Sequence, residues 1–447
     1  MSDSDEITRW LSARALPLTT LSAGEPYEDL RPLREVLQGV RIVGLGESTH
    51  GTREFFLLKH RLLEFLVREM GFRALAMEAS ESAALAVDAY VAGGAGDAGR
   101  LVSRLDFWTW RTHEIVAMVE WMREHNRTVP AAERVRFVGI DPQRCADSAA
   151  VVGTFLEQAA PATAESARET LRVLAASRPG ARPDPARRLY EEAGELAGFL
   201  EEHRAGLAAR TSPEAADDAI RHARILVRCA DLITLPLEPD PGEESLHAVR
   251  DRHMAGAVDA LVDATGDRVA VWAHNGHIAK GTYGAGVPAL GSLLRARHGE
   301  AYYALGLLFG KGRFLARRGI GTTGPAVRHR IGRDGRSVEH RLAAAVPGDY
   351  LVDLRGGEAQ AAPAVREWLR GPGLQRSFGA NVPRFTYRFH LAPLVPAAEY
   401  DGLAFVAKST CSRPLASTAS AVCPSPAVRR CTDASRPTWP NSSGRCS

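Results

Sequence analysis

The chain has 447 residues, of which 45% are apolar and 24% are charged, and this composition excludes a chain that is disordered throughout. Lys and Arg together number 56 against 53 Asp and Glu, which leaves a net charge of only +3. That surplus is too small to drive binding to phosphate backbones or to anionic lipid. We therefore expect no nucleic-acid partner.

The N-terminus and the cysteines indicate the compartment. The first residues, MSDSDE, lack the basic and apolar regions of a secretory signal, and no run of 18 apolar residues occurs along the chain. The sequence therefore predicts a cytoplasmic protein with no membrane segment. Four of the six cysteines lie from Cys411 onward, without C-x-x-C spacing, so we expect neither a disulfide scaffold nor a zinc ribbon.

Short apolar runs that end in polar residues are the clearest signal of the fold. Four of them cover residues 41–47, 73–79, 134–141 and 268–277, and each is typical of a buried parallel strand. Helical spacing of apolar residues predicts helices between the first two runs, ending at Gly71, and over 81–91 and 113–126. This alternation predicts an α/β fold whose central, largely parallel sheet is flanked by helices.

The domain organisation follows from changes in composition. Residues 146–264 are rich in Ala, Glu and Arg with helical periodicity, which predicts an insertion of four or five helices that forms a lid or subdomain over the strand ends. Residues 1–145 and 265–414 are then the two halves of the α/β domain. In the second half, segments 301–309, 350–354, 384–390 and 403–408 are expected to extend the same sheet. Residues 415–447, rich in Ser and Pro, are expected to be a disordered tail.

Ionisable side chains follow all four of the first predicted strands. Because the carboxyl ends of parallel strands meet in one crevice, we expect these side chains to form a polar active site. In chain order they are Glu47, His50, Glu78, Asp141, His274 and His277.

Several kinds of site are excluded by motifs that are missing. The glycines around GLGESTHG fit neither a P-loop nor G-x-G-x-x-G, and no G-x-S-x-G exposes a nucleophile, so Ser48 is interpreted as a helix cap. Histidine with carboxylates suits activation of water, which predicts a hydrolase without a covalent intermediate. Two alternatives stay open. A metal-dependent hydrolase would use His50, His274 and His277 as ligands, and a non-enzymatic protein would only bind a hydrophobic small molecule.

Three stretches, 44–80, 137–143 and 271–281, together with YDGLAFVAKST at 400–410, resemble the erythromycin esterase family. The similarity runs from about residue 5 to residue 414. It implies an enzyme that cleaves a small-molecule ester or lactone, extending to macrolide ring opening and antibiotic resistance, with no cofactor and no required metal. It implies that His50 activates water, and that Glu47, Glu78, His274 and His277 occupy the other active-site positions.

Four further residues are candidates for substrate binding. Lys59 stands where macrolide esterases of this family tend to carry arginine, and its alternative is a solvated helix lysine. Trp108 and Trp110 are expected to form the wall of an apolar cleft or to pack between lid and sheet. Asp141 belongs either to the site or to a helix cap. The Ser-Thr before His50 differs from the Asn-Ser of macrolide-active members, and the sequence leaves the oligomeric state open.

Overall fold

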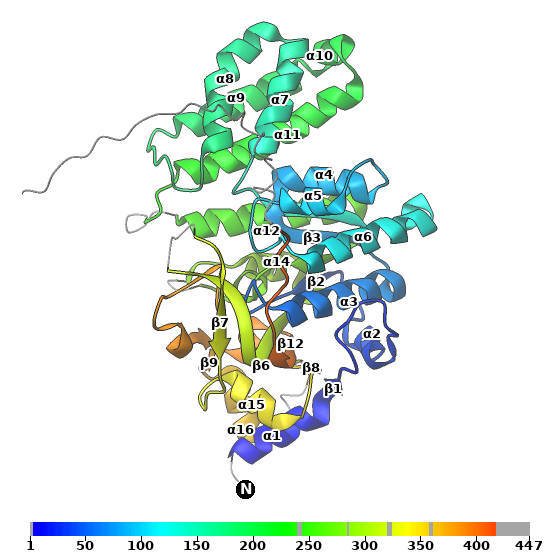
Figure 1. Ribbon diagram of the computed structural model, residues 1–447, viewed down its shortest axis with the longest axis vertical. Helices are drawn as coiled ribbons and strands as arrows, with labels where there is room; N and C mark the ends of the chain where they lie inside the picture. The colour runs from blue at the N-terminus through cyan, green and yellow to red at the C-terminus, as the bar shows by residue number, and fades with distance from the viewer. Residues whose placement is uncertain (1–2, 239–243, 284–285, 320–323, 357–360, 417–447) are drawn as a thin grey trace, which may run out of the picture. The chain divides into compact units, whose positions relative to one another are not determined.

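The centre of the molecule is a ten-stranded sheet, shown in Figure 1. The computed structural model describes residues 3–238, 244–283, 286–319, 324–356 and 361–416, and residues 1–415 form one unit. Six neighbouring strands run parallel, in the spatial order β12, β6, β2, β5, β3 and β4, while β8 and β1 continue the sheet antiparallel. The predicted α/β fold with a largely parallel sheet is therefore confirmed.

The strand bounds are as follows. The main sheet contains β1 (Ala15–Pro17), β2 (Ile42–Leu45), β3 (Phe72–Ser80), β4 (Arg136–Asp141), β5 (Arg268–Trp272), β6 (Tyr302–Arg318), β7 (Val327–Ile331), β8 (Tyr350–Asp353), β10 (Asn381–Val382) and β12 (Gly402–Ser409). A separate two-stranded sheet pairs β9 (Gly373–Gln375) with β11 (Ala392–Leu394).

Helices cover both faces of the main sheet because its central strands are apolar on both sides. In β2, Val43 and Leu45 belong to one core and Ile42 to the other. The first core is completed by α2 (Leu33–Val36), α3 (Arg53–Met70), α4 (Glu81–Val91), α5 (Ala98–Ser103) and α6 (His113–Thr128). The second is completed by α1 (Asp3–Arg14), α12 (Leu246–Thr265), α13 (Asn275–Ile278), α14 (Leu290–His298), α15 (Val338–Ala345), α16 (Pro363–Arg370) and α17 (Pro396–Glu399).

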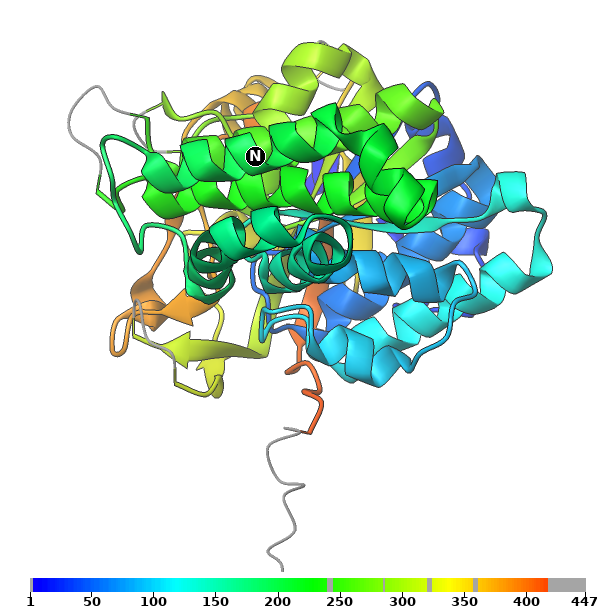
Figure 2. The ribbon, with the colours of Figure 1, turned by 90° about the horizontal axis from the view of Figure 1, so that it is seen from above.

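The helical insertion has a core of its own. It contains α7 (Ala146–Ala159), α8 (Pro161–Ala176), α9 (Arg188–Glu202), α10 (Arg204–Arg210) and α11 (Pro213–Thr234), and these helices form the group beyond α4 and α12 in Figure 1 and the green helices seen from above in Figure 2. The last helix of the predicted insertion, α12, differs, because Met254, Val258 and Val262 pack in the core of the sheet. It is therefore a crossover helix that leads the chain back into β5.

Two expectations about local structure have different outcomes. The predicted end of α3 is confirmed, because Gly71 takes the left-handed conformation (φ 72°) and its N–H bonds to the carbonyl of Leu66. The predicted strand over residues 384–390 is wrong. The alternating aromatics there remain largely exposed, with Phe385 79% and Phe389 77% accessible, and the segment closes a 3₁₀ turn, η5 (Tyr387–Phe389), rather than pairing with a strand.

The remaining 3₁₀ turns are η1 (Glu28–Leu30), η2 (Ala131–Glu133) and η4 (Gly299–Ala301). None of the helices in the described part of the chain is both long and apolar enough to cross a membrane. Nearly all of the predicted tail, residues 417–447, lies outside the described residues. Before it, Pro414 bridges to Thr112 and the N–H of Leu415 donates to the carbonyl of Arg111, so the chain up to Leu415 is tied to the α/β unit.

A buried asparagine holds the sheet together just beyond the end of β2. The Asn275 side chain donates to the Leu307 carbonyl and accepts from the Leu307 N–H, both at 3.0 Å, and thereby links the end of β5 to β6 across the segment that follows β2. Gly46 passes beneath it, and a Cβ there would come within 2.1 Å of Asn275 Oδ1. The glycine before Glu47 is therefore required by close packing.

We expect Asn275→Ala to lower the free energy of unfolding by about 1–3 kcal/mol, because it leaves the buried backbone N–H of Leu307 unpaired. Urea denaturation of the two proteins measures this difference. A loss below about 0.5 kcal/mol, the usual range for an ordinary surface substitution, would contradict this role.

Candidate functional site

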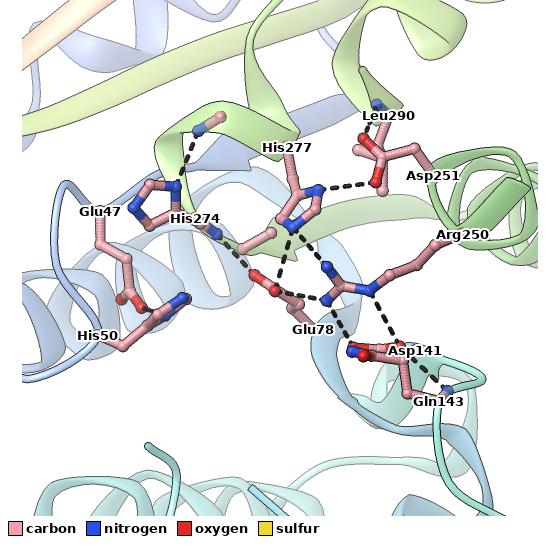
Figure 3. Close-up of polar contacts among 12 residues, drawn as sticks. Glu47, His50, Glu78, Asp141, Gln143, Arg250, Asp251, His274, His277 and Leu290 are labelled. Atoms are coloured by element: carbon pink, nitrogen blue, oxygen red, sulfur yellow. Dashed lines mark hydrogen bonds and ion pairs between the residues drawn. The ribbon is translucent and has the colours of Figure 1, made fainter. Parts of the chain in front are cut away.

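The carboxyl ends of four neighbouring strands carry the predicted ionisable residues. The spatial order β2, β5, β3, β4 places Glu47 and His50 beside His274, and His277 beside Glu78 and Asp141, as Figure 3 shows. After the helical insertion the chain forms β5, which lies between β2 and β3. Sheet order, rather than distance along the sequence, therefore assembles the cluster.

His50 is held by a buried carboxylate. Its Nδ1 lies 2.8 Å from Oε1 of Glu47, whose side chain is fully buried. If Nδ1 carries the hydrogen and donates it to this carboxylate, Nε2 keeps a free lone pair. Among the described residues Nε2 has no hydrogen-bond partner, and His50 lines a pocket. This arrangement fixes the ring and leaves one nitrogen able to accept a proton.

Lys59 supports this pair from behind. Its Nζ lies 2.8 Å from Oε2 of Glu47, contacts the carbonyl of Ala273 at 3.3 Å and stands 4.5 Å from the Trp272 ring. Burial lowers its pKa to about 8, although the charge of Glu47 acts in the opposite direction. Lys59 is fully buried and does not line the pocket, so it is neither a solvated helix lysine nor in reach of a substrate there.

Glu78 is the centre of a second network. One carboxylate oxygen binds the Arg250 guanidinium at 2.7 Å, and the other accepts the backbone N–H of His274 at 2.8 Å. Arg250 also binds Asp141 at 2.6 Å. Burial favours the neutral acid, but the charges of His277 and Arg250 outweigh it and hold the pKa of Glu78 well below its usual range.

His277 lies in the same network, between two carboxylates and 3.0 Å from Nη1 of Arg250. Its Nε2 lies 3.2 Å from Glu78 and its Nδ1 lies 2.8 Å from Asp251, while the Tyr283 hydroxyl is 2.8 Å from Nδ1. Burial opposes the charge, yet Asp251 and Glu78 raise the pKa of His277 to about 10. A histidine in this state has no lone pair to accept a proton at neutral pH.

His274 has the opposite character. Its Nδ1 accepts the backbone N–H of Gly276 at 3.1 Å, so in the neutral ring the hydrogen is on Nε2. Burial and the neighbouring His50 lower the pKa of His274 to about 3. The His274 and His50 rings are 5.0 Å apart between centroids. A neutral donor therefore stands beside the ring that can accept a proton.

A pocket of about 460 Å³ opens over these groups, a volume within the usual range for small-molecule sites. Both predicted tryptophans line it. Trp110 meets the His50 ring edge-on at 5.5 Å and donates from its indole N–H to the Glu78 carbonyl at 2.7 Å. Trp108 lies at the pocket wall beneath the guanidinium of Arg317.

Seven of the nine predicted site residues line this pocket, while Glu47 lies behind His50 and Lys59 lies behind Glu47. Asp141 belongs to the site network and also accepts the Gln143 N–H at 3.2 Å. Ser48 does not cap α3, because Thr52 stands at the N-cap position and the Ser48 hydroxyl has no partner among the described residues.

Sequence reasoning missed Arg250, Asp251 and Tyr283. A signal for Asp251 existed, since it falls on the same helical face as Met254 and Val258, where an acid is out of place. Arg250 gave no such signal, because its two partners come from strands more than a hundred residues earlier.

In the described part of the chain, no three His, Cys, Asp or Glu side chains are arranged as ligands for a metal ion. The three-histidine arrangement considered above also meets a chemical obstacle. Both nitrogens of His277 face charged or hydroxyl partners, and Nδ1 of His50 is taken by Glu47.

The family model of erythromycin esterase matches residues 67–409. Erythromycin esterase type II of Escherichia coli is 31% identical over 137 residues, which are 30% of this chain and 31% of that protein. The putative hydrolase YbfO of Bacillus subtilis is 29% identical over 149 residues, 32% of this chain and 31% of that protein. Erythromycin esterase type I of Escherichia coli is 25% identical over 279 residues, 57% of this chain and 66% of that protein. The chain thus spans about a third of the first two relatives.

Solved structures share the fold. A succinoglycan biosynthesis protein superposes with a TM-score of 0.75 at 23% identity, covering 92% of this chain and 98% of its own. A histidine-to-asparagine mutant of the erythromycin esterase EreC, in its open conformation, gives a TM-score of 0.64 at 18% identity, covering 89% and 98%. With a family model that matches from α3 to the last strand of the sheet, the chain belongs to the erythromycin esterase family.

Proposed function

We propose that the protein is a hydrolase in which His50 activates water to cleave a carboxylic ester or lactone. The observation that carries this proposal is the pairing of His50 with Glu47, which leaves Nε2 unpartnered at the pocket. Membership of the erythromycin esterase family supports an ester as the substrate class.

In the proposed reaction, water gives a proton to Nε2 of His50 while its oxygen attacks the ester carbonyl carbon. Glu47 stabilises the imidazolium that forms, and Lys59 holds Glu47 in place. The tetrahedral intermediate then expels the alkoxide, which takes the proton from His50. An acid and an alcohol leave, and the histidine returns to its neutral state.

His274 is assigned to the developing negative charge. Its neutral ring carries the hydrogen on Nε2, a buried atom close to the Phe378 backbone, and the residue lines the same pocket as His50. A donor already in position when the oxyanion forms stabilises the transition state without further reorganisation. Glu78 fixes this residue through its backbone N–H, so we assign Glu78, His277 and Arg250 to positioning.

The names of the relatives point to a macrolide as the substrate. Macrolide ring opening, and with it antibiotic resistance, is one form of the lactone hydrolysis that we propose. Two other interpretations lead to different experiments. A metal-dependent hydrolase would need ligands that the described residues do not offer. A protein that only bound a hydrophobic molecule would gain nothing from the buried ionic groups at the base of this pocket.

We expect His50→Asn to lower turnover of a hydrolysable ester by about 10²–10⁴, because it removes the proton acceptor while preserving the shape of the side chain. The matched control is His340→Asn, at an exposed histidine of α15. Steady-state kinetics and melting temperature of both variants test this. Turnover within about threefold of the wild type in His50→Asn would contradict the role of a general base.

The charge on His277 makes a prediction about pH. Its folded pKa of about 10 lies above the ordinary 6.5, so the ion network stabilises the fold fully below about pH 6.5, and this contribution declines as the pH rises toward 10. We expect His277→Gln to lower the free energy of unfolding more at about pH 6 than at about pH 10. Urea denaturation at the two pH values measures the difference, and an equal loss at both would refute the assigned charge.

We expect turnover to survive dialysis against a chelator, because the water is activated by a histidine held by a carboxylate. The control is the same dialysed protein with Zn²⁺ or Mn²⁺ restored. If activity were lost and one ion recovered it, His50 and His274 would have to be reassigned as metal ligands.

A further inference from the structure

The lining of the pocket includes an arginine that has no carboxylate partner among the described residues. Arg317, on β6, lines the pocket, and its guanidinium lies 5.8 Å above the Trp108 ring. Its Nε is buried and has no hydrogen-bond partner, and Arg317 forms no ion pair within the described ranges of the chain. Other arginines at this end of the sheet, such as Arg250, are bound to carboxylates. Among the described residues, Arg317 is thus a cation without an acidic partner.

Arg317 is the arginine of this group that lines the pocket, while the charges of Arg111 and Arg178 act on it and Arg144 is linked to it through Arg178. Burial, and next the charges of Arg178 and Arg111, lower the pKa of Arg317, and burial with Arg178 lowers the pKa of Arg144. Arg111 precedes α6, Arg144 precedes α7 and Arg178 follows α8. We call these four arginines the arginine mouth.

Carboxylates near the arginine mouth do not balance it. Asp106 interacts with Arg144 and Arg111, and among the described residues its carboxylate forms no ion pair with another base. Asp141 also acts on Arg144 but is bound to Arg250, and Asp147 is bound to Arg104. Among the described residues the mouth therefore carries an excess of positive charge, whereas each charge on the pocket floor has an opposite partner.

We propose that the arginine mouth binds an anionic group on the substrate, so that the enzyme acts on esters or lactones that carry a carboxylate or a similar anion. The inference rests on the proposed hydrolysis and adds the substrate class. A guanidinium is suited to this because it pairs with carboxylates in a planar, bidentate geometry and stacks on aromatic rings. Trp108 provides the ring on which Arg317 lies.

The same geometry orients the substrate. The floor offers His50 and His274 for the carbonyl, while Arg250 is already occupied by Glu78 and Asp141. An anionic end of the substrate therefore has its free partner at the mouth rather than at the floor. Binding there directs the ester carbonyl inward, toward Nε2 of His50.

Two esters that differ only at the far end test this proposal. Mono-4-nitrophenyl succinate ends in a carboxylate where 4-nitrophenyl butyrate ends in a methyl group, and both release the same alcohol. We expect the wild type to prefer the succinate by about tenfold or more in kcat/KM, the effect of one charge-assisted hydrogen bond. In Arg317→Gln this preference should fall about tenfold, mainly through the KM for the succinate.

The matched control is Arg313→Gln, which removes the same charge from an exposed position of the same strand that does not line the pocket. It should retain the preference. Equal kcat/KM for the two esters in the wild type, or an equal loss of preference in both variants, would overturn the proposal. So would faster hydrolysis of the uncharged ester or of erythromycin, which is cationic at neutral pH.

A binding measurement separates this inference from the proposed function. N-phenylsuccinamic acid and N-phenylbutanamide are amide analogues of the two esters, and calorimetry with the wild type and Arg317→Gln compares their affinities. Selective binding of the acid, lost in Arg317→Gln, supports the arginine mouth even if no ester is turned over, which would count against hydrolysis alone. Turnover of both esters without selective binding of the acid would overturn the arginine mouth and leave hydrolysis standing.

Discussion

The site depends on the burial of Glu78. This carboxylate is only 6% exposed, and such a group is costly unless charged and polar partners surround it. Arg250 and His277 provide the positive charges, and the backbone N–H of His274 donates a hydrogen bond to the other carboxylate oxygen of Glu78. Because each partner comes from a different segment, the ion network fixes α12 and the end of β5 relative to β3. The proposed catalytic pair, Glu47 and His50, therefore lies beside a network whose members are held in place.

The three histidines at this edge of the sheet have different electrostatic surroundings. His277, between two carboxylates, is held as a cation, while His274, buried beside another imidazole, is held neutral. His50 has one carboxylate and one open nitrogen. Residue type alone does not distinguish them. The number of carboxylates that each ring faces does, and this number is set by the order of the strands and, for His277, also by Asp251 on α12.

Much of this was predictable because strand ends are visible in the sequence. Apolar runs that stop at Glu47, Glu78 and Asp141 predict both the strands and their shared edge, since parallel strands align their carboxyl ends. The partners from α12 were not predictable, because Arg250 acts across more than a hundred residues of sequence and its helix reads as part of the insertion. The prediction of a strand over residues 384–390 was wrong for a related reason. Its alternation of aromatics matches a strand, but no strand was there to pair with it.

The floor and the mouth of the pocket divide the work of recognition. Charges on the floor are paired within the protein, so they organise the catalytic groups and have little left to offer a ligand. The arginines of the arginine mouth lie on β6, before α6, and on segments that lead into and out of the first helices of the insertion. Substitutions in those segments would change which substrate is held without disturbing how water is activated.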